Sequence, residues 1–288
     1  MSTFILYRTN YSSLFLENAW SLGDLEMLKW LHKKQIKGCT FHAVDHSIIY
    51  GIDVMEWLCV SYKVKCSEMA MDFAAASNRL DIVKWLHENR TEGCTTSAMD
   101  HAARYGHLDI VKWLHENRNE GCTKNAMDWA AAKGHLDVVK WLHENRNEGC
   151  TTNAIDWSIR NGHLDVVKWL YENRKEGCTS DAMDYAIIHN HVDIVKWLHE
   201  KWHMEFTFGA VDLAIVNGHI DMIKYLYEQK LFKDCSSDVM NTAVERGHFE
   251  VIRFLYDHDI QKCTPWALEL AVRNDRYDIV KFLEEKNM

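Results

Sequence analysis

The chain has 288 residues, and its 33 basic residues against 42 acidic residues give a net charge of -9. This balance, without any run of Lys or Arg, argues against a nucleic-acid partner, whose phosphates need a basic surface, and against an anionic membrane partner. No segment approaches the roughly 18 consecutive apolar residues of a membrane span, and the N-terminus lacks the long apolar region of a secretion signal. We therefore expect an intracellular, cytoplasmic protein.

One unit recurs along the chain. Residues 134–150, GHLDVVKWLHENRNEGC, show it most clearly, because close copies begin at Gly106 and Gly162. The acidic residue after the turn recurs every 27 to 29 residues, at Glu26, Asp53, Asp81, Asp109, Asp137, Asp165, Asp193, Asp221, Glu250 and Asp278. A constant period of roughly 20 to 50 residues is typical of a solenoid.

Residues 1–13 precede the first copy, and we expect a cap extension or a disordered segment there. The first copy diverges from the others, with helices expected at 14–22 and 25–31. Divergence is typical of a terminal repeat, because one of its faces has no neighbour and meets water. No Gly-, Ser- or Pro-rich linker interrupts the remaining copies. We predict one all-α helical solenoid of about ten helix-turn-helix repeats over residues 14–288.

Each full copy predicts two helices around a Gly-His turn. In the second helix, from Leu136 to Leu142, apolar side chains cover more than half of the circumference, as expected for a helix with neighbours on several sides. We interpret its recurring large ring as packing: Trp85, Trp113, Trp141, Trp169, Trp197, Tyr225, Phe254 and Phe282. In the first helix, small residues such as Ala126 and Ala130 share one face, so this helix can approach its neighbours closely.

A Thr or Ser near the start of each first helix predicts the N-cap. These residues are Thr40, Ser67, Thr95, Thr123, Thr151, Thr179, Thr207, Ser236 and Thr264. A second register begins two residues later, at Asn125 or Asn153, where Asp128 or Asp156 closes a capping box. The sequence leaves both registers open.

Helix, Gly-His turn, helix and loop, with HLDVVKWL after the turn, resemble the ankyrin repeat over residues 14–288. The usual TPLH opening is absent, with Thr264 and Pro265 its nearest match, and the period is 28 residues instead of about 33. The resemblance implies an array without projecting β-hairpins and with a short loop near residues 147–151. Similar short repeats abound in giant DNA viruses and protists, which implies the host cytoplasm for a viral chain.

Cysteine and histidine recur once per repeat. Eight of the nine cysteines share one position: Cys39, Cys66, Cys94, Cys122, Cys150, Cys178, Cys235 and Cys263. Disulfide Cα atoms must come within about 7 Å, whereas stacked helices lie about 8 to 10 Å apart, so we expect small buried thiols. One His per repeat cannot supply several zinc ligands, and we interpret the turn histidines as structural hydrogen-bonding groups. We predict no catalytic residue, no metal and no cofactor.

An acidic column within the first helix has two interpretations. Its members are Asp72, Asp100, Asp128, Asp156, Asp184 and Asp212, followed by Asn241 and Glu269. It serves either as a ladder for a basic partner or as a structural cap for backbone amides at the helix start.

The residues that differ between copies are the better guide to a binding site. Directly after the acidic column and just before the turn, they are rich in Arg, Tyr and Trp, as interface hot spots are. We predict a partner-binding surface on the concave face of the first helices, formed by His101, Arg104, Tyr105, Trp129, Lys133, Trp157, Arg160, Tyr185 and His189. Packing of these aromatic rings between adjacent first helices is the alternative.

The predicted function is protein–protein recognition by a non-enzymatic scaffold or adaptor. We expect a monomer that binds a protein partner, and neither nucleic acid nor a membrane. The alternative is a structural spacer, or a virion or assembly component, without a dedicated ligand in the groove.

Overall fold

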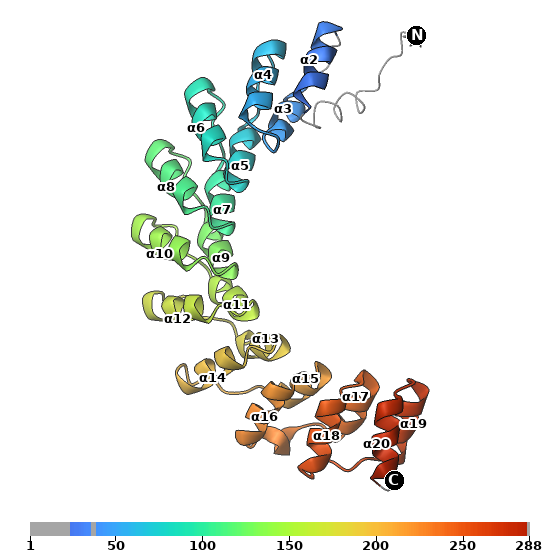
Figure 1. Ribbon diagram of the computed structural model, residues 1–288. Helices are drawn as coiled ribbons and strands as arrows, with labels where there is room; N and C mark the ends of the chain where they lie inside the picture. Colours follow the sequence, from blue (N-terminus) through green and yellow to red (C-terminus); the bar gives the residue numbers. More distant parts are fainter. Residues whose placement is uncertain (1–23, 36–38, 287–288) are drawn as a thin grey trace, which may run out of the picture. The chain divides into compact units, whose positions relative to one another are not determined.

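The computed structural model describes residues 24–35 and 39–286 (Figure 1). This part of the chain contains 19 α-helices, one 3₁₀-helix and no strand, which confirms the all-α solenoid of helix-turn-helix repeats. The predicted segment 1–13 and the predicted helix at 14–22 lie outside the described residues. The chain divides into two compact units between Thr151 and Thr152.

Unit 1, which ends at Thr151, contains a row of first helices and a row of second helices (Figure 1). The first helices are α3 (Phe41–Ser47), α5 (Glu68–Ala76), α7 (Thr96–Arg104) and α9 (Lys124–Ala132). The second helices are α2 (Leu25–Lys33), α4 (Ile52–Tyr62), α6 (Leu80–Asn89), α8 (Leu108–Asn117) and α10 (Leu136–Asn145). The first row has the Ala-rich sequences and the second row has the Trp-bearing sequences.

Unit 2, which begins at Thr152, repeats the alternation. Its first helices are α11 (Asn153–Arg160), α13 (Ala182–Ile188), α15 (Ala210–Val216), α17 (Val239–Arg246) and α19 (Pro265–Arg273). Its second helices are α12 (Leu164–Asn173), α14 (Val192–Glu200), α16 (Ile220–Glu228), α18 (Phe249–Asp257) and α20 (Tyr277–Glu285). The 3₁₀-helix η1 (Leu231–Asp234) follows α16.

The core follows the predicted periodicity. On α7, Ala98, Met99 and Ala102 are at most 2% exposed, and on α8 the buried residues are Ile110, Val111 and Leu114. Because the buried residues of the first helices are small, α7 packs extensively along α5 and α9, whereas α8 and α10 touch at few positions. Unit 1 therefore bends toward its first helices, which lie on its inner side (Figure 1).

A glycine with positive φ follows five of the first helices, at Gly106, Gly134, Gly162, Gly218 and Gly247, and Asn or Asp takes its place after α5, α13 and α19. Gly106 has φ +75°, and its N–H and the N–H of His107 bond to the carbonyls of Ala103 and Ala102 at 3.1 and 2.9 Å. This is the Schellman pattern, which satisfies the last carbonyls of a helix and favours glycine because its φ is positive. The second helix then begins one residue after His107.

The predicted N-caps are right in one part of the chain and wrong in another. Ser67, Thr95, Thr123 and Thr264 cap their helices through the side-chain oxygen, and Thr40 occupies the cap position without such a bond. The prediction is wrong for Thr151, Thr179, Thr207 and Ser236, because the N-caps there are Thr152, Asp181, Gly209 and Asp238. In these copies the α-helix starts one or two residues later, where Tyr185 N–H bonds to the carbonyl of Asp181 at 2.9 Å and Leu213 N–H bonds to that of Gly209 at 2.8 Å.

Candidate functional site

Five predicted site residues lie on the first-helix face of unit 1. His101 and Arg104 belong to α7, and Tyr105 is the residue that follows it. Trp129 belongs to α9, and Lys133 follows that helix. Tyr105 is 47% exposed and Lys133 is exposed, whereas His101, Arg104 and Trp129 are half-buried.

The structure brings four of these side chains into contact. The rings of His101 and Trp129 have centroids 5.3 Å apart. The Arg104 guanidinium lies 5.3 Å from the Trp129 ring and 5.5 Å from the Tyr105 ring. Both distances are within the cation–π range of about 6 Å. The rings pack against their neighbours, as the alternative interpretation holds, and they also stay partly exposed, so the partner-binding surface remains a prediction.

Phe73 continues the surface on α5, although it is not one of the predicted site residues. It is 38% exposed, and its ring stacks on that of His46 with centroids 6.1 Å apart. Phe73 occupies the same repeat position as His101 and Trp129, directly after a buried aspartate. We call the set Phe73, His101, Arg104, Tyr105, Trp129 and Lys133 the aromatic–basic patch.

The other four predicted residues lie on the first-helix face of unit 2. Trp157 and Arg160 belong to α11, Tyr185 belongs to α13, and His189 follows α13. Arg160 and His189 are exposed, and Trp157 and Tyr185 are half-buried. Burial, together with Arg160, His191 and His219, lowers the pKa of His189.

The acidic column fixes how the first helices are rotated. The carboxylate of Asp100 accepts from the backbone N–H and from the hydroxyl of Thr123, at 2.8 and 2.7 Å. Asp72 and Asp128 bind Thr95 and Thr151 in the same way, always 23 residues further along. Because the aspartate points into the interface with the next repeat, the residue that follows it points outward.

This geometry favours the structural interpretation of the acidic column over a ladder for a basic partner. Asp72, Asp100, Asp128 and Asp156 are all at most 8% exposed. Burial raises the pKa of the Asp100 carboxyl, although the hydrogen bonds from Thr123 oppose that rise. The capping box within one helix is wrong, because each aspartate binds the start of the next repeat.

The turn histidines also join successive repeats. His107 Nε2 lies 3.1 Å from the carbonyl oxygen of Ala76, and His219 Nε2 lies 2.8 Å from that of Ile188. A carbonyl only accepts, so these nitrogens carry the proton. The prediction of a structural hydrogen-bonding role is confirmed for these histidines, although the partner belongs to the preceding repeat and not to the turn itself.

A loop network was missed by the sequence prediction. Arg118 forms an ion pair with Glu120, and its Nη1 lies 3.3 Å from His87 Nδ1 in the preceding repeat. Glu120 Oε1 also accepts from the backbone N–H of Cys94 at 3.4 Å. Arg146 repeats these contacts with Glu148 and His115. The signal was present in the sequence, because Arg-x-Glu-Gly-Cys recurs in consecutive copies.

No two cysteines of the column are joined by a disulfide. Cys66, Cys94, Cys122 and Cys150 are buried, as predicted, whereas Cys39, Cys178, Cys235 and Cys263 are half-buried. Burial raises the pKa of both the Cys94 and the Cys122 thiol to about 12. A nucleophilic cysteine requires the opposite shift, toward the thiolate.

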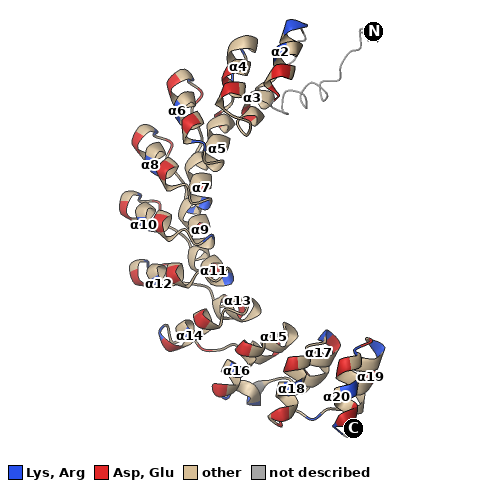
Figure 2. Ribbon diagram, viewed as in Figure 1, with Lys and Arg blue, Asp and Glu red and all other residues tan. Residues whose placement is uncertain are grey.

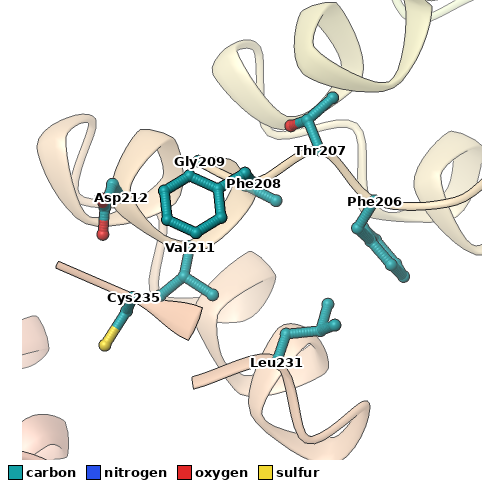
Figure 3. A pocket seen from close by; sticks show the side chains of 9 residues that line it. Phe206, Thr207, Phe208, Gly209, Val211, Asp212, Leu231 and Cys235 are labelled. Carbon is teal, nitrogen blue, oxygen red and sulfur yellow. The ribbon is translucent and has the colours of Figure 1, made fainter. Parts of the chain in front are cut away.

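Unit 2 departs from the regular repeat near α15 and η1. A pocket of about 360 Å³ is formed there by the loop before α15, by α15 and by the segment 231–235 (Figure 3). Phe208 in this loop is 88% exposed, and Asp212 and Cys235 also line the pocket. Asp212 and Cys235 are the titratable residues of its lining, and the Asp212 carboxylate accepts from the backbone N–H of Ser236 at 3.1 Å.

Within residues 24–35 and 39–286, no group of three or more His, Cys, Asp and Glu side chains is arranged to hold a metal ion. None of the helices there has the length and apolar character needed to cross a membrane.

The comparisons with known proteins agree with the geometry. The family model of ankyrin repeats in sets of three copies matches at residues 16–128, 71–156, 99–182, 127–208, 157–237 and 211–288. No curated protein matches the chain. The viral or protist origin stays a prediction. Since the family matches span the repeats in both units, the chain belongs to the ankyrin-repeat family.

Proposed function

We propose that this chain is a non-enzymatic adaptor that binds a partner protein through the face of its first helices. Ankyrin repeats generally mediate protein–protein interactions. The observation that carries the proposal for this chain is the placement of Arg104 against the rings of Tyr105 and Trp129 at the surface of unit 1. Tyr, Trp and Arg are the residues that most often dominate the energetics of protein interfaces.

The other conspicuous residues already have structural roles. The acidic column binds the next repeat, the turn histidines bind the preceding repeat, and burial raises the pKa of the Cys94 and Cys122 thiols. The aromatic–basic patch is the set whose members differ from copy to copy and still reach solvent. We place recognition there, with Trp157, Arg160, Tyr185 and His189 as the corresponding surface of unit 2.

The proposed setting is the cytoplasm, with the protein acting as a monomer. The nine cysteines include no disulfide among the described residues, which suits a reducing compartment. Neither nucleic acid nor a membrane is the proposed partner, because the chain has a net charge of -9.

Affinity capture from a cell lysate tests the proposal. The full chain and the double variant Tyr105→Ala/Trp129→Ala serve as baits, and the matched control is Glu116→Ala/Glu144→Ala, two exposed residues of α8 and α10. We expect one partner in stoichiometric yield with the wild-type and control baits, and its loss with the aromatic variant. Capture that survives in all three baits contradicts a first-helix site, and a structural spacer then becomes the better account.

A further inference from the structure

We propose that the aromatic–basic patch takes an acidic peptide segment of its partner, one with two or more Asp or Glu side chains beside an aromatic or aliphatic anchor. This inference rests on the proposed function and adds the chemistry of the partner. It is carried by three features of the patch, which are its unneutralised cations, the fixed position of Arg104 and the exposed rings next to it.

The cations of the patch have no carboxylate partner. No ion pair involves Arg104 or Lys133 in the part of the chain that the structure describes. The nearest acids along the same helices, Asp100 and Asp128, are buried and are bound by Thr123 and Thr151. The patch therefore presents positive charge without a neighbouring exposed acid on α7 or α9.

Three arginines elsewhere in unit 1 each have a carboxylate partner. Arg118 and Arg146 pair with Glu120 and Glu148, and Arg79 pairs with Asp81. Figure 2 shows acidic residues on the second helices α6, α8 and α10, and basic residues beside α7 and α9. In a chain with a net charge of -9, this first-helix surface is locally opposite in sign, so it is complementary to an acidic segment.

Contacts with two aromatic rings orient the guanidinium of Arg104 so that it can bind a carboxylate. Its guanidinium lies against Trp129 on one side and Tyr105 on another, at 5.3 and 5.5 Å. A guanidinium binds a carboxylate through two parallel hydrogen bonds in its own plane, which leaves its faces free to stack on rings. Since the side chain is already ordered by these contacts, less conformational entropy is lost on binding.

The exposed rings define the second half of the ligand. Tyr105 is 47% exposed and Phe73 is 38% exposed, while the half-buried Trp129 lies between His101 and Arg104. An aromatic or aliphatic side chain that packs on these rings buries apolar area from both partners. The carboxylates beside this anchor then reach Arg104 and Lys133.

A structural explanation of the two cations has to be separated from a binding role. Both follow or end a helix, where the partial negative charge of the C-terminus favours a cation. If this is their only role, Arg104→Gln/Lys133→Gln lowers thermal stability slightly and leaves peptide binding unchanged. Binding and stability are therefore both measured on the same variant.

The test is a selection of displayed random 12-residue peptides on the full chain, with counter-selection on Tyr105→Ala/Trp129→Ala. We expect the enriched peptides to be net negative and to contain an aromatic or aliphatic residue. A synthetic copy of the most enriched peptide should bind roughly two- to fivefold more weakly for each cation removed, the range that a partly exposed ion pair gives. Its Gln/Asn version should bind the wild-type chain more weakly still, and Arg104→Glu should prefer a Lys version of the peptide.

The outcomes separate this inference from the proposed function. Enriched peptides that are neutral or basic, or whose binding ignores Arg104→Gln/Lys133→Gln, overturn the acidic ligand and leave the first-helix site standing. Enrichment of no peptide on the wild-type chain over Tyr105→Ala/Trp129→Ala overturns both. Binding of a 12-nucleotide uridine RNA is measured as well, because exposed rings beside cations also stack on bases. RNA that binds the patch more tightly than every selected peptide overturns the inference.

Discussion

The Asp100 carboxylate accepts hydrogen bonds from both the backbone N–H and the hydroxyl of Thr123, which is the N-cap of the next first helix. The Thr123 hydroxyl in turn accepts from the N–H of Asn125 at 3.1 Å. One carboxylate thus orients the cap of α9 from α7, so the bond that joins two repeats also starts a helix. The stack depends on such bonds because neither helix pair buries its apolar face alone.

We expect Asp100→Ala to lower the free energy of unfolding by about 1 to 3 kcal/mol, because it leaves two donors of Thr123 without their acceptor in a partly buried site. Urea denaturation followed by circular dichroism measures the change. Asp109→Ala, at an exposed position of α8, is the matched control, with an expected change within about 0.5 kcal/mol. Equal losses for the two variants would contradict the inter-repeat role of Asp100.

Replacing both Asp100 and Thr123 should lower the free energy of unfolding by less than the sum of the two single substitutions. Thr123→Val keeps the shape of the side chain and removes the hydroxyl, so it loses the bond to Asp100 and the cap of α9. In a double-mutant cycle with Asp100→Ala, we expect a coupling energy of about 0.5 to 3 kcal/mol. Additive losses would mean that the two side chains stabilise the protein independently.

The loop network predicts a loss of stability in acid. Burial raises the pKa of Glu120, but the hydrogen bonds from Arg118 and from backbone amides outweigh it and bring the pKa to about 2. A carboxyl whose pKa is lowered from 4.5 in the folded state stabilises the protein above pH 4.5, and this contribution is lost as the pH falls toward about 2. Glu176 behaves likewise, with a pKa of about 2.

The measurement is the urea midpoint of the wild type and of Glu120→Gln/Glu176→Gln at pH 6 and at pH 3. The variant should be less stable than the wild type at pH 6, and its stability should decrease less than that of the wild type between pH 6 and pH 3. An identical decrease in both proteins would show that these carboxyl groups have ordinary pKa values. The contribution of the buried Asp100 to stability has the opposite pH dependence, because its raised pKa favours the protonated form in the folded state. Both proteins in the comparison therefore retain Asp100.

The Gly-His turn predicts a difference between two glycine substitutions. Gly106 and Gly177 have nearly the same positive φ, +75° and +71°, so an alanine costs about 1 to 2 kcal/mol of backbone strain at either position. A Cβ on Gly106 also meets the His135 ring at 2.6 Å, whereas nothing lies within 4 Å of one on Gly177. In thermal denaturation, the melting temperature of Gly106→Ala should be lower than that of Gly177→Ala. Equal melting temperatures would mean that the ring moves away without cost.

The cysteine column predicts slow thiol chemistry. Cys94 and Cys122 are buried and have pKa values of about 12, so at pH 8 they are both inaccessible and protonated. With a chromogenic disulfide reagent, we expect these thiols to react only after urea is added, and peptide mapping identifies them. Fast labelling of either thiol in the native protein would reopen the question of catalysis.

The repeat period, the two-helix unit and the buried face of each helix were predictable, because they depend on spacing within one copy. The role of Asp100 stayed open in the sequence, since its partner Thr123 lies 23 residues away in the next repeat. The N-caps of α11, α13, α15 and α17 were predicted wrongly, because residues such as Thr179 and Thr207 look like Thr95 in sequence, although their helices start two residues later.

The candidate site was predictable as a face and not as a set of contacts. Helical periodicity places His101, Arg104 and Trp129 on one side of the first helices. It does not show that Arg104 lies across the Trp129 ring, because that contact depends on rotamers and on the separation of α7 and α9. Phe73 was recognisable as the next member of the column, but its exposure depends on its neighbours in the stack.

Hydroxyl-radical footprinting of the full chain, with and without its captured partner, tests recognition by the first-helix face most directly. Tyr105 and Trp129 should lose most of their oxidation when the partner binds, while Tyr171 and Tyr277, which are 40% and 78% exposed outside this face, should keep theirs. Unchanged oxidation of Tyr105 and Trp129, with protection of Tyr171 or Tyr277 instead, would contradict the account.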